Sequence, residues 1–223
     1  MKTGRVIVSL FFVAMAGNFL FSECKAHTEK VDNYRLSHSE GRVRCIKQET
    51  GETLSKITPH IHLRSSFGNL SPSQVHSMPN VFIRKKDEWG FYGHSTVRHH
   101  YAEKSVNGDC VVIDAATGLM WHQSGSGDYM SWNSAKEWIK KLNNKGYAGY
   151  QDWRLPTLEE AASLLEQGKT NNLYIAPVFD EIQWGIWSGD MHGSEGAWSV
   201  YFSLGNVRWN VKNRFVRPVR SIK

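Results

Sequence analysis

The stretch GYAGYQDWRLPTLEE, residues 146–160, decides how the second half of the chain folds. Gly146 follows a segment with helical spacing and is a typical residue just past the end of a helix. Pro156 ends one element, and Thr157 with Glu160 then forms a capping box, in which each side chain bonds the other residue's backbone N–H. The stretch therefore predicts that one helix ends where it begins and that a second helix starts before it finishes.

The two helices are predicted from the apolar spacing on either side of this stretch. The first has Ser131 as its N-cap, and lysines occupy its polar face. Its apolar positions are Trp132, Ala135, Trp138, Ile139 and Leu142. The second begins at Thr157 and is expected to close at Gly168, with a buried stripe of Leu158, Ala161, Ala162, Leu164 and Leu165.

Short strands are predicted around the helices. Asp109–Asp114 and residues 119–121 form a hairpin-like pair about the turn at 116–118. After the second helix, strands at 184–188, 197–203, 207–211 and 214–221 are expected to complete a meander. Two helices with short antiparallel strands predict an α+β domain over residues 109–223.

Composition divides the chain near residue 108. Eight of the ten histidines lie in residues 27–108, whereas eight of the nine tryptophans lie in residues 109–223. This shift predicts a domain boundary, with residues 27–108 as a less regular N-terminal region of unassigned role. Its His60/His62 and His99/His100 pairs lack the spacing typical of zinc sites. We therefore expect neither a metal nor a cofactor.

The beginning of the chain has the pattern of a secretory signal peptide. Lys2 and Arg5 precede an apolar run at residues 6–21, shorter than the roughly 20 residues that a membrane-spanning helix needs. Cleavage after Ala26, or after Ala16, would give an exported protein that is periplasmic, on the outer surface or secreted. The protein would be held at a membrane only if Cys24 were lipidated instead.

The cysteines are consistent with export. Without residues 1–26, Cys45 and Cys110 remain, and an oxidising compartment would allow them to form a disulfide. Two separate buried thiols are the alternative, because the sequence gives no geometry. Three cysteines are too few for a disulfide-dense scaffold or a Cys-rich metal framework.

Several motifs recur in the order of a known family: TGLMW at 117–121, DWRLPT at 152–157, IWSGD at 186–190, AWSVYF at 197–202 and VRPVR at 216–220. Residues 109–221 thereby resemble the Lcl C-terminal domain family. The resemblance implies a C-type-lectin-like α+β fold in an exported bacterial protein. It also implies adhesion to sulfated glycans, the property of the collagen-like adhesin after which the family is named.

The motif residues are expected to hold the fold in shape. Asp152 and Arg154 flank Trp153, and we expect their side chains to form a buried or half-buried polar arrangement that fixes the loop before the second helix. On a strand, Arg217 shares a face with Phe215 and Val219 and is expected to form an ion pair at the edge of the core. The residues assigned this structural role are Thr117, Gly118, Trp121, Asp152, Trp153, Arg154, Pro156, Thr157, Glu160 and Arg217.

The basic C-terminal segment supplies the candidate binding site. Residues 208–223 contain six Arg and Lys residues and no acid, and arginine forks match the oxygens of sulfate or phosphate. We expect a module that binds a sulfated glycan or another polyanion. The candidate ligand-binding residues are Arg208, Trp209, Lys212 and Arg214.

Other functional classes have less support. No nucleophile motif such as GxSxG is present, and Asp190 and His192 are expected to be solvated loop residues, so we expect no enzyme. An uncharacterised hydrolase, a non-catalytic envelope scaffold and an oligomerisation domain stay as alternatives, and self-association is left open. Export argues against nucleic-acid binding, despite a formal net charge of +6.

Overall fold

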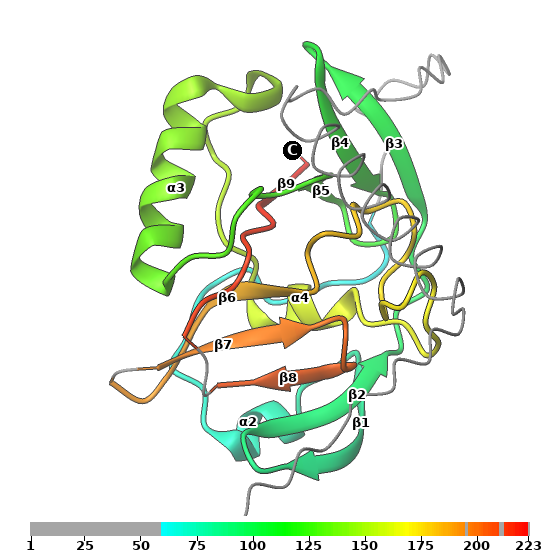
Figure 1. The fold of residues 1–223 in the computed structure, drawn as a ribbon. Coiled ribbons are helices and arrows are strands. Elements are labelled where there is room, and N and C mark those ends of the chain that lie inside the picture. Colours follow the sequence, from blue (N-terminus) through cyan, green and yellow to red (C-terminus); the bar gives the residue numbers. More distant parts are fainter. Residues whose placement is uncertain (1–58, 195, 210–211, 223) are drawn as a thin grey trace, which may run out of the picture. The chain divides into compact units, whose positions relative to one another are not determined.

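The computed structural model describes residues 59–194, 196–209 and 212–222. Two antiparallel sheets form its framework (Figure 1). The five-stranded sheet runs in the order β1 (Val81–Asp87), β2 (Gly90–Ser95), β8 (Asn206–Arg208), β7 (Gly196–Tyr201) and β6 (Gly185–His192). The four-stranded sheet runs in the order β3 (Tyr101–Val106), β4 (Asp109–Asp114), β5 (Leu119–His122) and β9 (Val219–Ser221). With three α-helices beside these sheets in the described residues, the architecture is α+β, as the sequence predicts.

The first predicted helix is confirmed as α3 (Trp132–Lys145). Ser131 Oγ accepts a hydrogen bond from the Ser134 backbone N–H, which caps the helix at its start. Gly146 has a φ of 66° and ends it, because this left-handed conformation is easy for glycine. The chain then makes a 3₁₀ turn at Tyr147–Gly149.

The second predicted helix begins where expected but is shorter. The capping box of Thr157 and Glu160 is present, and α4 spans Leu158–Ser163. The prediction that it closes at Gly168 is wrong. The backbone after Ser163 bonds elsewhere: the Leu165 carbonyl accepts from the Ser95 N–H (2.7 Å), and the Glu166 N–H donates to the Tyr174 carbonyl (3.1 Å).

The predicted C-terminal meander is only partly correct. Strands β6, β7 and β8 pair in succession. The chain then leaves this sheet, and β9 pairs with β5 in the other one. Only the end of the predicted strand at 214–221 is regular. Pro218 lacks an N–H and the Arg217 side chain is completely buried, so this segment crosses between the sheets as an irregular connection.

The described residues before position 109 are more regular than predicted. They form α2 (Pro72–His76) and strands β1, β2 and β3. The change in composition near residue 108 falls at the turn between β3 and β4, which pair along their whole length. Because β2 also pairs with β8, residues 81–106 contribute to both sheets.

In the four-stranded sheet, β4 and β5 are buried on both faces, whereas β3 is partly exposed. In β4, Val112 packs in the main core with Trp121 and α4, whereas Val111 and Ile113 pack with Leu142 of α3 and with Trp153. This two-sided burial explains the continuous apolar run of β4. Trp198 and Val200 of β7 extend the main core over the five-stranded sheet.

Several predictions concern residues that the structure does not describe. The signal peptide at residues 1–26, including Cys24, lies outside the described residues, as does Cys45. Cys110 is disulfide-bonded, and its pairing with Cys45 stays a prediction. Within the described ranges, no helix has both the length and the apolar character needed to cross a bilayer.

Candidate functional site

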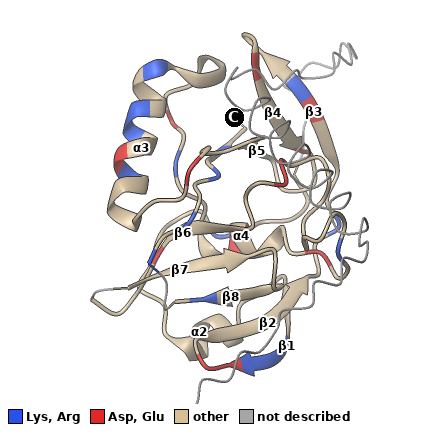
Figure 2. Ribbon diagram, viewed as in Figure 1, with Lys and Arg blue, Asp and Glu red and all other residues tan. Residues whose placement is uncertain are grey.

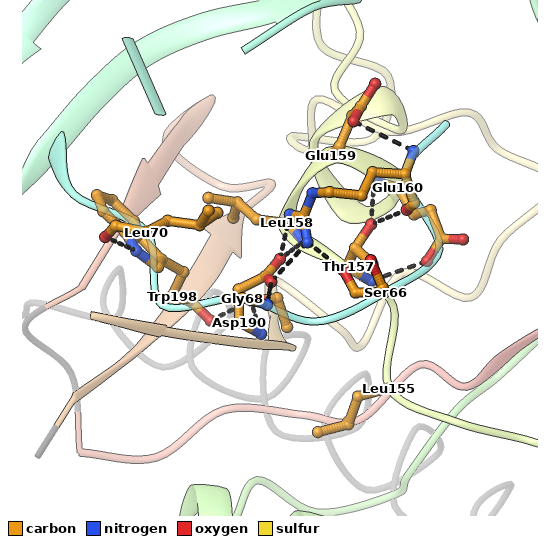
Figure 3. A network of polar contacts seen from close by, with 12 residues as sticks. Ser66, Gly68, Leu70, Leu155, Thr157, Leu158, Glu159, Glu160, Asp190 and Trp198 are labelled. Atoms are coloured by element: carbon orange, nitrogen blue, oxygen red, sulfur yellow. Dashed lines mark hydrogen bonds and ion pairs between the residues drawn. The ribbon is translucent and has the colours of Figure 1, made fainter. Parts of the chain in front are cut away.

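Asp190 of β6 is the centre of a polar network at the N-terminus of α4 (Figure 3). Its buried carboxylate accepts hydrogen bonds from the two Arg64 Nη atoms, at 2.9 and 2.7 Å. It also accepts from the backbone N–H groups of Gly68 (2.6 Å) and Leu158 (2.5 Å). Because the Leu158 N–H begins α4, a carboxylate from a distant strand satisfies it and interacts favourably with the helix dipole. The expectation that Asp190 is solvated is therefore wrong.

Two further carboxylates close the same end of α4. Glu160 accepts from both Arg154 Nη atoms (2.6 and 2.7 Å) and from the Thr157 backbone N–H (2.8 Å). Glu159 accepts from the backbone N–H of Arg64 (3.2 Å). These contacts cap α4 and join the segments around Arg64 and Arg154 to its start. The structural role assigned to Arg154, Thr157 and Glu160 stays a prediction.

Asp152 and Arg154 form ion pairs with different partners. Asp152 accepts from Arg220 Nε at 2.7 Å, and the Arg220 guanidinium lies 3.7 Å from the centre of the Tyr150 ring. Arg154 turns instead to Glu160. The two flanking charges therefore fix the Trp153 loop to two different elements, β9 and α4.

Arg217 is more deeply buried than predicted and is not part of an ion pair at the core edge. Its guanidinium donates to the carbonyls of His122 (3.2 Å), Gln123 and Asp180 (3.2 Å). It also lies against the Phe179 ring, 4.7 Å from its centre. Burial lowers the pKa of Arg217. The three carbonyls accept from its two Nη groups, which compensates part of the burial, whereas its Nε has no hydrogen-bond partner.

Thr117 and Gly118 form the turn after β4 around the buried carboxylate of Asp114. This carboxylate accepts from Thr117 Oγ1, from the His100 backbone N–H (3.0 Å) and from His99 Nδ1 (2.7 Å). Burial raises the pKa of Asp114, but the hydrogen bonds from His99, Thr117 and His100 outweigh it, so the pKa is lowered overall. Gly118 has a φ of 67°, which the turn requires.

His122 lies in the core. Its ring stacks on Tyr147 with the centres 4.0 Å apart, and Nδ1 accepts from the Gly125 N–H (2.9 Å). Burial and the charge of Arg217 lower its pKa to about 3, so the ring is neutral at physiological pH. In the described part of the chain, no group of three His, Cys, Asp or Glu residues could hold a metal ion.

Two of the four predicted ligand-binding residues lie against one aromatic ring. The Arg214 guanidinium is 3.8 Å from the centre of the Tyr201 ring and 5.0 Å from that of Trp184. Arg208 lies on β8, where Figure 2 shows a basic segment, and its guanidinium is 5.7 Å from the centre of the same Tyr201 ring. Arg208 has a carboxylate nearby, that of Asp87 at 3.5 Å. We name Arg208, Arg214, Tyr201 and Trp184 the cation–aromatic cluster.

Arg214 has little compensation for its burial. Arg214 is 5% exposed. Its Nη1 donates to the neighbouring Asn213 carbonyl, and its Nε has no hydrogen-bond partner. Burial lowers the pKa of the guanidinium to about 9, so it stays cationic at neutral pH. No carboxylate of the described residues forms an ion pair with it. An arginine held in this way can gain an anionic ligand's oxygens as partners.

The other two predicted residues have different surroundings. Lys212 is exposed. Trp209 is half-buried: it stacks on His192 with the centres 4.8 Å apart and meets Trp198 edge-on at 5.1 Å. Trp209 therefore packs within an aromatic group, whereas Lys212 lies close in sequence to the cation–aromatic cluster.

Two cavities lie outside this cluster. The first, of about 520 Å³, is a groove between α3, β6 and residues 67–69, and we name it the α3 groove. Its lining is mainly apolar: Phe67, Gly68, Asn69, Trp132, Lys136, Ile139, Trp153, Arg154, Leu155, Gly189 and Met191. The second, of about 740 Å³, is more polar and lies between residues 95–101 and 165–177.

Comparison with known proteins agrees with the motif order. Residues 110–220 match the family model described as the Lcl C-terminal domain. The chain contains an Lcl C-terminal domain. Comparison with curated proteins finds no match. Of the cation–aromatic cluster, Tyr201 lies in the AWSVYF motif, whereas Trp184, Arg208 and Arg214 lie outside the motifs quoted above.

Sequence reasoning missed several residues of the polar network at α4 and of the cation–aromatic cluster. Arg64 and Asp190 pair over a separation of 126 residues, which no local pattern signals. Tyr201 and Trp184 were visible only as strand aromatics. The alternation of β7 was a usable signal: Trp198 and Val200 point to the core, so Ser199 and Tyr201 lie on the other face, where Arg208 is paired opposite Ser199.

Proposed function

We propose that this chain is a non-catalytic binding module of a bacterial surface or secreted protein, and that it holds a sulfated glycan or similar polyanion at the cation–aromatic cluster. The Lcl C-terminal domain supports a surface or adhesin-related role. Export by the signal-peptide pattern of residues 1–26 and a C-type-lectin-like relationship of the α+β domain are parts of the same proposal.

The observation that carries the proposal is the state of Arg214. A buried guanidinium without a carboxylate partner is costly unless hydrogen bonds compensate it. The nearby Arg208 adds a second guanidinium on the same Tyr201 ring, and Lys212 adds an exposed ammonium. A sulfate group offers the planar guanidinium several oxygens at once, which a neutral sugar does not.

The aromatic side chains around Arg214 suit the sugar part of such a ligand. Trp184 and Tyr201 lie 5.4 Å apart between ring centres, and both are half-buried. Tyr129 is 58% exposed and meets Phe215 edge-on at 5.9 Å. The apolar face of a sugar ring can pack on an aromatic ring, whose polar groups stay at its edge. A sulfated sugar therefore matches both the aromatic rings and the guanidinium groups of the cluster.

The test is calorimetric titration of the full chain with a sulfated heparin oligosaccharide and with its desulfated counterpart. We expect binding of the sulfated form only, weakening steeply with salt. Arg214→Lys keeps the charge but removes the fork, and should weaken binding about tenfold. Lys212→Glu changes an exposed residue and should also weaken binding.

The matched control is Lys141→Glu, which makes the same charge change on the exposed face of α3. It should bind like the unmodified protein. Equal weakening by Lys141→Glu and Lys212→Glu would mean that only the overall charge matters. That outcome, or absence of binding at low salt, would overturn the assignment of the ligand to this cluster.

A further inference from the structure

The α3 groove is a second hollow whose chemistry differs from that of the cation–aromatic cluster. Six apolar side chains line it: Phe67, Trp132, Ile139, Trp153, Leu155 and Met191. Its volume of about 520 Å³ falls within the range of small-molecule sites. Phe67 is 51% exposed, so a large apolar ring faces solvent at the groove.

The two indole N–H groups of the groove walls are already bonded. The indole Nε1 of Trp132 donates to the Ser188 carbonyl (2.8 Å), and that of Trp153 donates to the Tyr147 carbonyl (3.0 Å). Both rings therefore offer carbon to the groove and no hydrogen-bond donor. A sugar with many hydroxyl groups would lose hydrogen bonds to water without replacing them, so the body of the ligand must be apolar.

The two charged side chains that line the groove differ in whether they already pair with a carboxylate. Lys136 and Arg154 are the ionisable side chains among the described residues that line the groove, and both are cationic. Arg154 already has two bonds to Glu160. Lys136 is exposed, and its Nζ lies 3.9 Å from the centre of the Trp132 ring, which positions the ammonium beside the apolar wall. Lys136 is part of α3, along which Figure 2 shows several basic segments.

We infer that the α3 groove binds a small amphipathic anion, an aliphatic carboxylate whose chain occupies the groove and whose carboxylate pairs with Lys136. Charge complementarity selects the carboxylate, and the carbon-lined walls select the chain. The inference uses no residue of the cation–aromatic cluster and is independent of the proposed glycan ligand.

The experiment is calorimetric titration of the full chain with decanoate, below the concentration at which it forms micelles. We expect saturable one-to-one binding, stronger than that of octanoate, because each methylene removed from water contributes up to about fourfold in affinity. Lys136→Glu should weaken decanoate at least tenfold. Decyltrimethylammonium, with the same chain and the opposite charge, should bind Lys136→Glu better than it binds the unmodified protein.

Two further variants test whether binding depends on the groove itself and not on the overall charge of the protein. Lys141→Glu, on the same helix and outside the groove, should leave decanoate binding unchanged. Phe67→Ala removes a half-exposed ring and should weaken decanoate and decyltrimethylammonium alike. The inference is overturned if decanoate does not bind saturably, or if Lys136→Glu binds it as the unmodified protein does. It is also overturned if Lys141→Glu weakens binding as much as Lys136→Glu, or if Phe67→Ala has no effect.

Discussion

Arg64 and Asp190, which are 126 residues apart in the sequence, form a bidentate ion pair with N–O distances of 2.9 and 2.7 Å. Arg64 also donates its backbone N–H to Glu159 (3.2 Å), and the Arg64 carbonyl accepts from Thr157 Oγ1 (2.7 Å). The segment around Arg64 is thus held both to β6 and to the start of α4.

Asp190→Asn should destabilise the fold strongly. The amide has nearly the same shape but leaves Arg64 without its charge partner and places an NH₂ group among donors. A buried hydrogen-bond donor left without its acceptor costs about 1–3 kcal/mol in the free energy of unfolding, which urea denaturation measures; the Arg64 side chain is 30% exposed, so solvent offsets part of its lost pairing. Glu137→Gln is the control, because the exposed Glu137–Lys140 pair should contribute nothing measurable. An Asp190→Asn variant as stable as this control would contradict the role given to Asp190.

His122 should make the protein less stable in acid. Its folded pKa is lowered from 6.5 to about 3, so the unfolded state takes up a proton well before the folded state does. Stability is therefore complete above about pH 6.5 and falls toward pH 3, at up to about 1.4 kcal/mol per pH unit. Urea denaturation between pH 7 and pH 4 measures this slope.

The variant His122→Gln removes the titrating group, and its stability should depend less on pH in this window. Asp114 does not confuse the result. Its pKa is lowered from a usual value of 3.8, so the stability that its hydrogen bonds provide is present above pH 4 and is lost only in stronger acid. A His122→Gln slope equal to that of the unmodified protein between pH 6.5 and pH 4 would show that the ring is not buried in neutral form.

Gly189→Ala should be costly because of Phe67. A methyl group at Gly189 would overlap the Phe67 ring, which lies directly against the glycine. We expect a loss of about 1–3 kcal/mol in the free energy of unfolding, the usual cost of overpacking. In a Phe67→Ala background the same change should cost much less, and a double-mutant cycle by urea denaturation gives the coupling. Equal costs in both backgrounds would disprove the contact.

Local signals explain the parts of the fold that the sequence predicts well. Ser131 and Gly146 bound α3, and Thr157 with Glu160 starts α4, because caps and left-handed glycines act within a few residues. The end of α4 could not be predicted in this way. It is set by bonds from residues 165 and 166 to Ser95 and Tyr174, which are distant in sequence.

Strands before residue 109 were missed because their burial is incomplete. In β1 only alternate residues at its start are half-buried and the middle is exposed, so Arg84, Lys85 and Lys86 resemble a solvated charge run. The candidate site was predictable in part. The basic composition of residues 208–223 pointed to Arg208 and Arg214. The pairing of β7 with β8 brings Tyr201 beside Arg208, and backbone bonds of residues 214 and 215 to Met130 and Gly185 bring Arg214 to the same ring.

The hairpin that joins β3 to β4 has a consequence for anyone who divides this chain. The recognised family segment starts at residue 110, yet a fragment cut there would lose β1 to β3 together with Phe91 and Val75 of the main core. The backbone edges of β4 and β8 would then be open to strands of other molecules, which is a route to aggregation. We therefore expect a stable fragment to need residues on the N-terminal side of the stretch by which the family is recognised.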